Sequence, residues 1–199
     1  MRSWDVFSPT PFTTGGNITT AFLRYGVLDY KAAARYVSQL PYGRNGEVAV
    51  TTAVLHEGCG TCSTKHALLR RLAAEQGLDI VLVLGIYEMN QQNTPAVGPV
   101  LERYGLSSLP EAHCYLRVDE NRVDVTHDRK KGQSTPMLVF RHEEDIAPEQ
   151  IGDYKIELHR RFMSRWMAET DAGVGRSLDE VCRIREECIR VLSGRAEMR

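Results

Sequence analysis

Residues 58–77 read GCGTCSTKHALLRRLAAEQG, and they place two cysteines, Cys59 and Cys62, just ahead of a segment with helical composition. Thr61 is a typical N-cap residue, and Gly77 is the residue type that most often follows the last helical turn. The pattern therefore predicts a helix that begins after Thr61 and ends before Gly77, with Cys62 in its first turn. What the sequence says about function depends on the role of these two thiols.

The segments on either side of this helix alternate between helical and extended patterns. An earlier helix is predicted over 29–40, because Asp29 can cap it, alanines fill it and a proline follows it. The sequence DIVLVLGIY at 79–87 is apolar on both faces, which is typical of a central buried strand. Residues 113–128 alternate in polarity and indicate a hairpin, and 136–141 can add another strand.

The C-terminal third reads as two helices within 148–194. The first carries a stripe of large apolar residues at helical spacing, which we interpret as core rather than as a cofactor site. The stripe consists of Tyr154, Leu158, Phe162, Met163, Trp166 and Met167. The second opens with a capping box formed by Ser177 and Glu180, and we interpret its cysteines, Cys182 and Cys188, as small apolar residues. Together these patterns predict an α+β fold in a single domain spanning 1–199.

Composition and charge exclude several classes of function. Hydrophobic residues make up 42% of the chain, enough for a core without a metal or disulfide. A net charge of −1 gives no electrostatic basis for binding nucleic acid or an anionic membrane, and we interpret the basic run at 129–131 as a solvated turn. The N-terminal residues lack the apolar segment of a secretory signal, and no apolar run approaches the roughly 20 residues of a membrane helix. Five cysteines, an odd number, predict thiols in a reducing cytoplasm.

A metal site and a redox pair are two possible roles for the C-x-x-C of Cys59 and Cys62. A structural zinc usually needs a second pair of ligands, and Cys114 and the histidines offer none at a suitable spacing, so we expect no metal. A thioredoxin-like motif follows a strand and begins a helix, and AVLHEG before Cys59 resembles a strand only loosely. The redox role stays open as an alternative.

The third role is that of a nucleophile, and it favours Cys62 over Cys59. The helix dipole at the first turn favours the thiolate and lowers the pKa of Cys62 below that of an ordinary thiol, and the unpaired N–H groups of that turn can stabilise an oxyanion. Cys62 also shares a helical stripe with Leu69 and Ala73, which we expect to face the core. Cys59 lies before the helix in a glycine-flanked loop, so it is the bystander.

A cysteine nucleophile needs a base and a group that orients the base, and the hairpin offers both. If residues 119–120 form a two-residue turn, Asp124 lies opposite Tyr115. His113 has the same parity as Tyr115, so His113 and Asp124 point to the same face as diagonal neighbours. A three-residue turn would move Asp124 to the other face, so the prediction depends on the register.

The residues at 58–126 resemble the transglutaminase-like superfamily. Its nucleophile helix follows the pattern G-x-C, L-L-R, G, which is similar to Gly60 and Cys62, Leu69 and Arg70, and Gly77. The segment HCYLRV followed by RVDVT resembles the superfamily's H-x-[WY] and V-D-x-T.

The resemblance implies a papain-like α+β fold, in which the helix bearing the cysteine packs on an antiparallel sheet. It also implies a Cys62–His113–Asp124 triad and acyl transfer through a thioester on a peptide, protein or small amide, without a cofactor. Members include transglutaminases, proteases, peptide N-glycanases and other amidases, so the fold does not name the substrate. One departure is the short hairpin, which puts the histidine and the aspartate 11 residues apart. Shortening both arms equally preserves their pairing.

A catalytically silent scaffold that binds a peptide or protein is the alternative from another class.

Other polar residues near the motif are candidates for supporting roles. His56 and Asn45 are candidates for the oxyanion hole, because papain-like sites often complete it with a side chain upstream of the cysteine. We expect His66, one turn after Cys62, to lie at the rim of the site. Asp128 is the alternative candidate for the carboxylate that orients His113.

Overall fold

The computed structural model describes residues 3–13, 15–46, 50–127 and 139–194. It combines helices with a four-stranded antiparallel sheet, which confirms the predicted α+β class. The strands lie in the order β3-β2-β1-β4. Their bounds are Val81–Asn90 for β1, Ser108–Val118 for β2, Asn121–Val123 for β3 and Phe140–Ile146 for β4.

The chain divides into two compact units that are described separately. The first comprises Met1–Leu84, Cys114–Thr135 and Glu144–Gly152, and the second comprises Gly85–His113, Pro136–Glu143 and Asp153–Arg199. Strands β1, β2 and β4 contribute residues to both units. Whether the units behave as one domain, as expected from chain length, stays a prediction.

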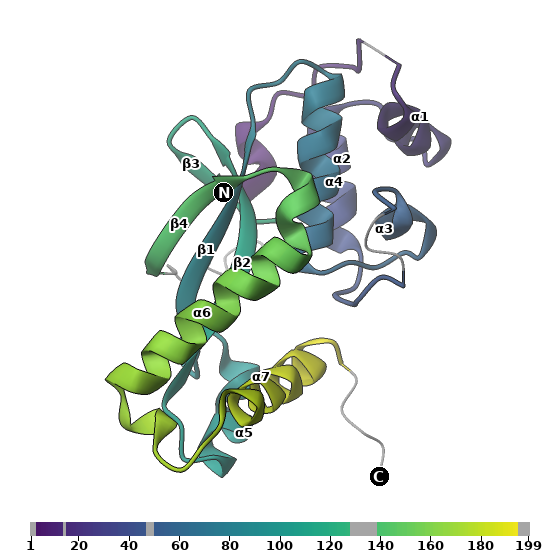
Figure 1. Ribbon diagram of the computed structural model, residues 1–199. Coiled ribbons are helices and arrows are strands. Elements are labelled where there is room, and N and C mark those ends of the chain that lie inside the picture. Colours follow the sequence, from purple (N-terminus) through teal and green to yellow (C-terminus); the bar gives the residue numbers. More distant parts are fainter. Residues whose placement is uncertain (1–2, 14, 47–49, 128–138, 195–199) are drawn as a thin grey trace. The chain divides into compact units, whose positions relative to one another are not determined.

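The first unit is built around helix α4, Cys62–Glu75, which packs against α1 and α2 (Figure 1). The other helices of this unit are α1 (Asn17–Arg24), α2 (Tyr30–Gln39), α3 (Ala53–His56) and the 3-10 turns η1 (Ser3–Val6) and η3 (Pro148–Ile151). Leu68, Leu69 and Leu72 are fully buried, so α4 is the centre of the core rather than a surface helix. The predicted cap of α2 is confirmed, since the Asp29 carboxylate accepts a hydrogen bond of 2.7 Å from the Ala32 N–H.

Helix α1 was not expected from the sequence, and a side chain from α4 explains how it is held. Both oxygens of the Glu75 carboxylate accept backbone N–H groups at its first turn, from Ile18 at 2.9 Å and Thr19 at 2.7 Å. A carboxylate there satisfies unpaired donors and complements the positive end of the helix. Gly16 permits this approach, because a Cβ on that residue would lie 2.1 Å from the Glu75 Cδ.

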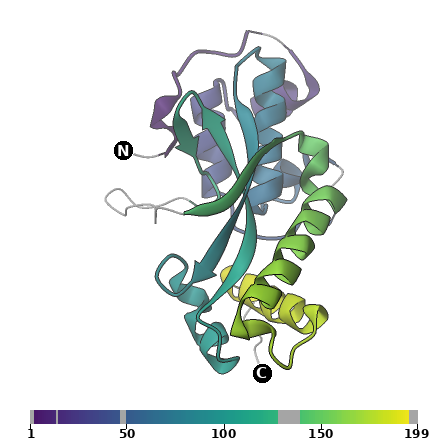
Figure 2. The same cartoon turned by 60° about the vertical axis from the view of Figure 1, so that its left-hand side comes forward.

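The second unit contains the two predicted C-terminal helices, α6 (Asp153–Glu169) and α7 (Leu178–Leu192). Helix α7 packs against both α6 and α5 (Gly98–Arg103) (Figure 2). Short 3-10 turns lie at Pro95–Val97 and Asp171–Gly173. The capping box of Ser177 and Glu180 is confirmed. The apolar stripe of α6 is core only in part: Leu158 and Met163 are buried, whereas Tyr154 is exposed.

The hairpin has the register expected from a two-residue turn. Val118 pairs with Asn121 and Leu116 with Val123, so the predicted turn at 119–120 is confirmed. Asp119 adopts φ of 49°, the left-handed conformation that tight hairpin turns require. β3 ends at Val123, immediately before Asp124. The strand expected over 136–141 begins at Phe140, and its first residues, 136–138, lie outside the described part of the chain.

Within the described residues, no helix combines the length and apolar character needed to cross a membrane.

Candidate active site

Cys62 is the first residue of α4, directly behind a complete N-cap. The Thr61 hydroxyl accepts the Thr64 N–H at 3.3 Å, and the Thr64 hydroxyl accepts the Thr61 N–H at 3.0 Å. This reciprocal pair satisfies two backbone donors of the turn and confirms the predicted cap. Cys62 is only 5% exposed, in agreement with its expected position on the core-facing stripe.

Gly60 brings the loop before α4 close to the helix. It forms a parallel bridge with Tyr42, and the Gly43 N–H donates to the Gly60 carbonyl at 3.2 Å. A Cβ on Gly60 would lie 2.9 Å from the Cγ of Lys65 and 3.2 Å from a methyl of Val54. A side chain at position 60 would therefore displace the first turn of α4.

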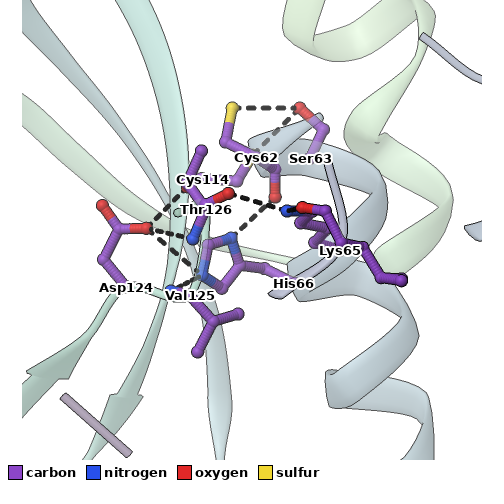
Figure 3. Close-up of polar contacts among 9 residues, drawn as sticks. Cys62, Ser63, Lys65, His66, Cys114, Asp124, Val125 and Thr126 are labelled. Atoms are coloured by element: carbon purple, nitrogen blue, oxygen red, sulfur yellow. Dashed lines mark hydrogen bonds and ion pairs between the residues drawn. The ribbon is translucent and has the colours of Figure 1, made fainter. Parts of the chain in front are cut away.

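Ser63 lies between two thiols. Its Oγ is 3.8 Å from the Cys62 Sγ and 3.6 Å from the Cys114 Sγ, and all three residues are buried (Figure 3). The Cys114 thiol donates to the hydroxyl, and the hydroxyl can donate to Cys62 at the same time. This arrangement gives the Cys62 sulfur a polar neighbour within the protein interior.

Lys65 is fully buried one turn after Cys62. Its ammonium donates to the carbonyl of Leu40 at 2.6 Å and to that of Thr126 at 2.7 Å. Burial is the largest influence on its pKa and lowers it to about 8, while the charges of Asp124, Cys59 and Cys62 oppose this shift. A lysine with this pKa carries a charge that changes near physiological pH.

His66 is also fully buried, so its expected place at the rim of the site was wrong. Its Nδ1 lies 2.6 Å from the Cys62 carbonyl oxygen, and its Nε2 lies 2.9 Å from the Val125 backbone nitrogen. The Val125 N–H can donate only to an unprotonated Nε2, so the proton resides on Nδ1 and points at the carbonyl. In this arrangement His66 fixes the first turn of α4, and its Nε2 lone pair is already used.

Asp124 lies in the segment that these two side chains hold. Its Oδ1 accepts from the Thr126 N–H at 2.8 Å and from the Thr126 hydroxyl at 2.6 Å, and it lies 3.6 Å from the His66 Nε2 (Figure 3). Lys65 binds the carbonyl of Thr126 and His66 binds the N–H of Val125. Consecutive residues of α4 therefore tie the turn that carries Cys62 to the segment that carries Asp124.

His113 belongs to the second unit, where its ring makes a T-shaped contact with that of Tyr87 at a centroid distance of 6.1 Å. Cys62 and Asp124 belong to the first unit. The structure thus brings the predicted nucleophile and the predicted carboxylate into one cluster, while the geometry of the complete Cys62–His113–Asp124 triad stays a prediction.

The two oxyanion candidates occupy different environments. His56 is exposed at the end of α3. Asn45 is buried, and its amide nitrogen donates to the Cys59 carbonyl at 3.0 Å and to the Glu57 carboxylate at 3.3 Å. The Asn45 Oδ1 has no hydrogen-bond partner within the described residues. An oxyanion hole needs donors, and those of Asn45 already hold the loop before α4, so its oxyanion role stays a prediction.

The remaining candidates are the other thiols and Asp128. All five cysteines lie in the described part of the chain, and each is a thiol rather than half of a disulfide. Burial raises the pKa of Cys188 to about 11 and also raises that of Cys182, so neither favours the thiolate. Asp128, the rival carboxylate, lies outside the described residues. Across the described ranges, no cluster of histidine, cysteine or acidic side chains is arranged to hold a metal ion.

Lys65 was missed as a site residue and His66 was placed at the rim, although the sequence contains a signal for the burial of both. They follow Cys62 by three and four positions and precede Leu69 by four and three, so all four share one helical face. Polar residues within a core-facing stripe are either paired in the interior or functional. Extending the core-facing stripe of the helix to include Lys65 and His66 would have identified both as buried polar residues.

Comparison with known proteins adds no relative. No family model, no curated protein and no solved structure matches the chain.

Proposed function

We propose that the protein is a cysteine-dependent amide hydrolase or acyltransferase of the transglutaminase-like superfamily, with Cys62 as its nucleophile. The observation that carries the proposal is the position of Cys62 at the capped first turn of a buried helix, in one cluster with Asp124. The helix N-terminus favours a thiolate and offers backbone donors to a developing oxyanion. The α+β fold with a cysteine at the start of a central helix agrees with a papain-like arrangement.

The proposed reaction proceeds through a thioester. The Cys62 thiolate attacks the amide carbonyl carbon, the C–N bond breaks, and His113 as imidazolium protonates the departing ammonia or amine. Water or an amine then attacks the thioester, gives its proton to His113, and releases the thiolate. Asp124 holds the imidazole in the required tautomer. The roles of His113 and Asp124 as partners rest on the sequence pattern, and no cofactor takes part.

The substrate class is a peptide, a protein or a small amide. The sequence contains no acidic cluster of the kind that forms a regulatory calcium site, which argues against an animal-type crosslinking enzyme. The odd number of cysteines supports action in the cytoplasm.

Trapping the acyl-enzyme tests the proposal. The purified chain is incubated with glutamine peptides and small amides, ammonia release is measured, and Cys62 is examined for a thioester by mass spectrometry. We expect release with the wild type and loss of at least about 100-fold in Cys62→Ala and in His113→Ala, since a nucleophile and its base act as a unit. Cys182→Ala is the matched control, because that thiol lies in the second unit.

Iodoacetamide at pH 6 separates the alternatives. Selective alkylation of Cys62 supports the nucleophile. Slow, uniform alkylation of all five thiols, together with no ammonia release, supports a catalytically silent scaffold that binds a peptide or protein partner. A reversible mass loss of about two hydrogens, mapped to Cys59 and Cys62, supports a C-x-x-C redox protein.

A further inference from the structure

The first turn of α4 contains a buried cation with an unusual set of neighbours. Lys65 is fully buried, and its ammonium donates hydrogen bonds to two backbone carbonyls, those of Leu40 and Thr126. Carbonyl oxygens satisfy its N–H groups but carry no net charge. A buried ammonium also gains from a nearby anion, because charges interact strongly away from water.

Three groups that can carry negative charge act on Lys65. Asp124 comes from the segment after β3, Cys59 from the loop before α4, and Cys62 from the turn of α4 that precedes Lys65. The Asp124 Oδ1 already accepts two hydrogen bonds from Thr126. Cys62 is three residues before Lys65, a spacing that places the two side chains on one face of the helix.

We propose that the Lys65 ammonium is the counter-charge of a resting Cys62 thiolate, so that the two form a buried charge pair across the first turn of α4. The proposal rests on the proposed function in one respect, that Cys62 acts as a thiolate. It deepens that function by making the resting thiolate independent of His113. Lys65 is then a positioning residue, which prepares the nucleophile without touching the substrate, and His113 is needed only for proton transfer during turnover.

The geometry holds the Lys65 ammonium in one position beside the first turn of α4. Gly60 lies against the Lys65 stem, Thr126 and Leu40 hold its ammonium, and the Ser63 hydroxyl lies 3.8 Å from the Cys62 sulfur. The thiolate therefore has three sources of stabilisation: the capped helix end, the hydroxyl of Ser63 and the ammonium of Lys65.

The experiment measures the rate of Cys62 alkylation by iodoacetamide from pH 5 to pH 9 in the full chain. We expect Lys65→Met to move the midpoint of the Cys62 profile upward by at least about one pH unit, which slows alkylation at pH 6 about tenfold. Lys31→Met is the matched control: it removes one positive charge from the same unit, where Lys31 faces Asp5 from α2. We expect that variant to keep the wild-type profile.

A second measurement covers the case in which Lys65→Met does not fold. The titration of the Lys65 ammonium is followed by NMR in the wild type and in Cys62→Ser. Because coupling between two sites is reciprocal, removal of the thiolate must make Lys65 lose its proton at lower pH. An unchanged Lys65 midpoint, or a Lys65→Met profile equal to that of Lys31→Met, overturns the charge pair.

The outcomes distinguish this inference from the proposed function. If Lys65→Met shifts the alkylation profile but the wild type releases no ammonia from any amide, the charge pair is supported and the proposed enzyme activity is contradicted. If the wild type releases ammonia but Lys65→Met leaves the alkylation profile unshifted, the enzyme activity is supported and the charge pair is contradicted.

Discussion

Lys65 in the first unit is a buried cation and Arg185 in the second is a partly buried one, and their surroundings differ. Arg185 makes a bidentate contact with the Glu111 carboxylate, with N–O distances of 2.7 and 2.5 Å. Burial alone lowers the pKa of Arg185, but Glu111 outweighs burial and raises it above its ordinary value. Lys65 is held by two carbonyls, and burial prevails, so its pKa falls to about 8.

The comparison separates a structural charge from a titratable one. A planar guanidinium matched to a carboxylate stays charged at every pH at which the protein is folded. A lysine held mainly by neutral acceptors can exchange its proton near neutrality and responds to any charge that appears beside it. Strongly perturbed titratable groups cluster at functional sites, and here the perturbed lysine lies one turn from the candidate nucleophile.

The largest effect is expected from Arg185→Leu in the second unit. This change leaves the Glu111 carboxylate buried without its partner, which costs about 3–5 kcal/mol of the free energy of unfolding. Urea unfolding monitored by circular dichroism measures the loss. The double variant Glu111→Leu/Arg185→Leu removes both charges and should recover most of it. A double variant as unstable as the single one would show that packing, rather than the unpaired charge, sets the cost.

The acid side of the stability profile should depend on the same pair. Burial alone raises the pKa of Glu111, but Arg185 outweighs it and lowers the pKa from 4.5 to about 2. The unfolded chain therefore takes up the proton first as the pH falls, and about 3 kcal/mol of stability, present above pH 4.5, is lost on the way to pH 2. The difference between urea unfolding curves of the wild type and the double leucine variant isolates this contribution. A difference that stays constant from pH 6 to pH 3 would contradict it.

Lys65 should make stability rise with pH in the same way, but on the alkaline side. Its pKa is lowered from 10.5 to about 8 in the folded state, so the unfolded chain holds more protons between these values. Stability attributable to Lys65 therefore rises with pH from about 8, by at most about 3 kcal/mol at pH 10.5. Buried tyrosines and cysteines act in the opposite direction, so the wild-type curve is compared with that of Lys65→Met. If the two curves run parallel between pH 7 and pH 10, Lys65 does not titrate in this range.

The elements that local patterns specify were predicted well. The cap at Thr61, the end of α4 before Gly77 and the turn at 119–120 follow from residue types at fixed offsets, and the structure contains all three. Helix α1 was missed because a distant side chain secures its N-terminus: Glu75 supplies the acceptors that no residue beside Asn17 provides. Such long-range capping cannot be read from a local window.

In the candidate site, too, residues specified by local patterns were predicted and residues held by distant contacts were not. Cys62 was predicted from its place in the first helical turn and Asp124 from the hairpin register, and both also lie in the motifs that resemble a known superfamily. Lys65 was not considered and His66 was placed at the rim, because a polar residue on a helix is by default expected to face water. Their burial depends on the carbonyl of Thr126 and the N–H of Val125, which the hairpin register places against α4.

The smallest effect is expected from the N-caps of α4 and α7, whose loss should affect stability equally but the reactivity of Cys62 unequally. Thr61 and Ser177 are both N-cap residues within capping boxes, one at α4 and one at α7. Replacing either with alanine should cost about 1 kcal/mol, because each change leaves a backbone N–H without its acceptor. Only Thr61→Ala disturbs the helix end that favours the Cys62 thiolate, so only that variant should slow alkylation of Cys62 at pH 6, by about two- to fivefold. Equal slowing in Ser177→Ala would mean that the alkylation rate of Cys62 reports global stability. Equal rates in both variants and the wild type would mean that the helix end contributes nothing to the reactivity of the thiol.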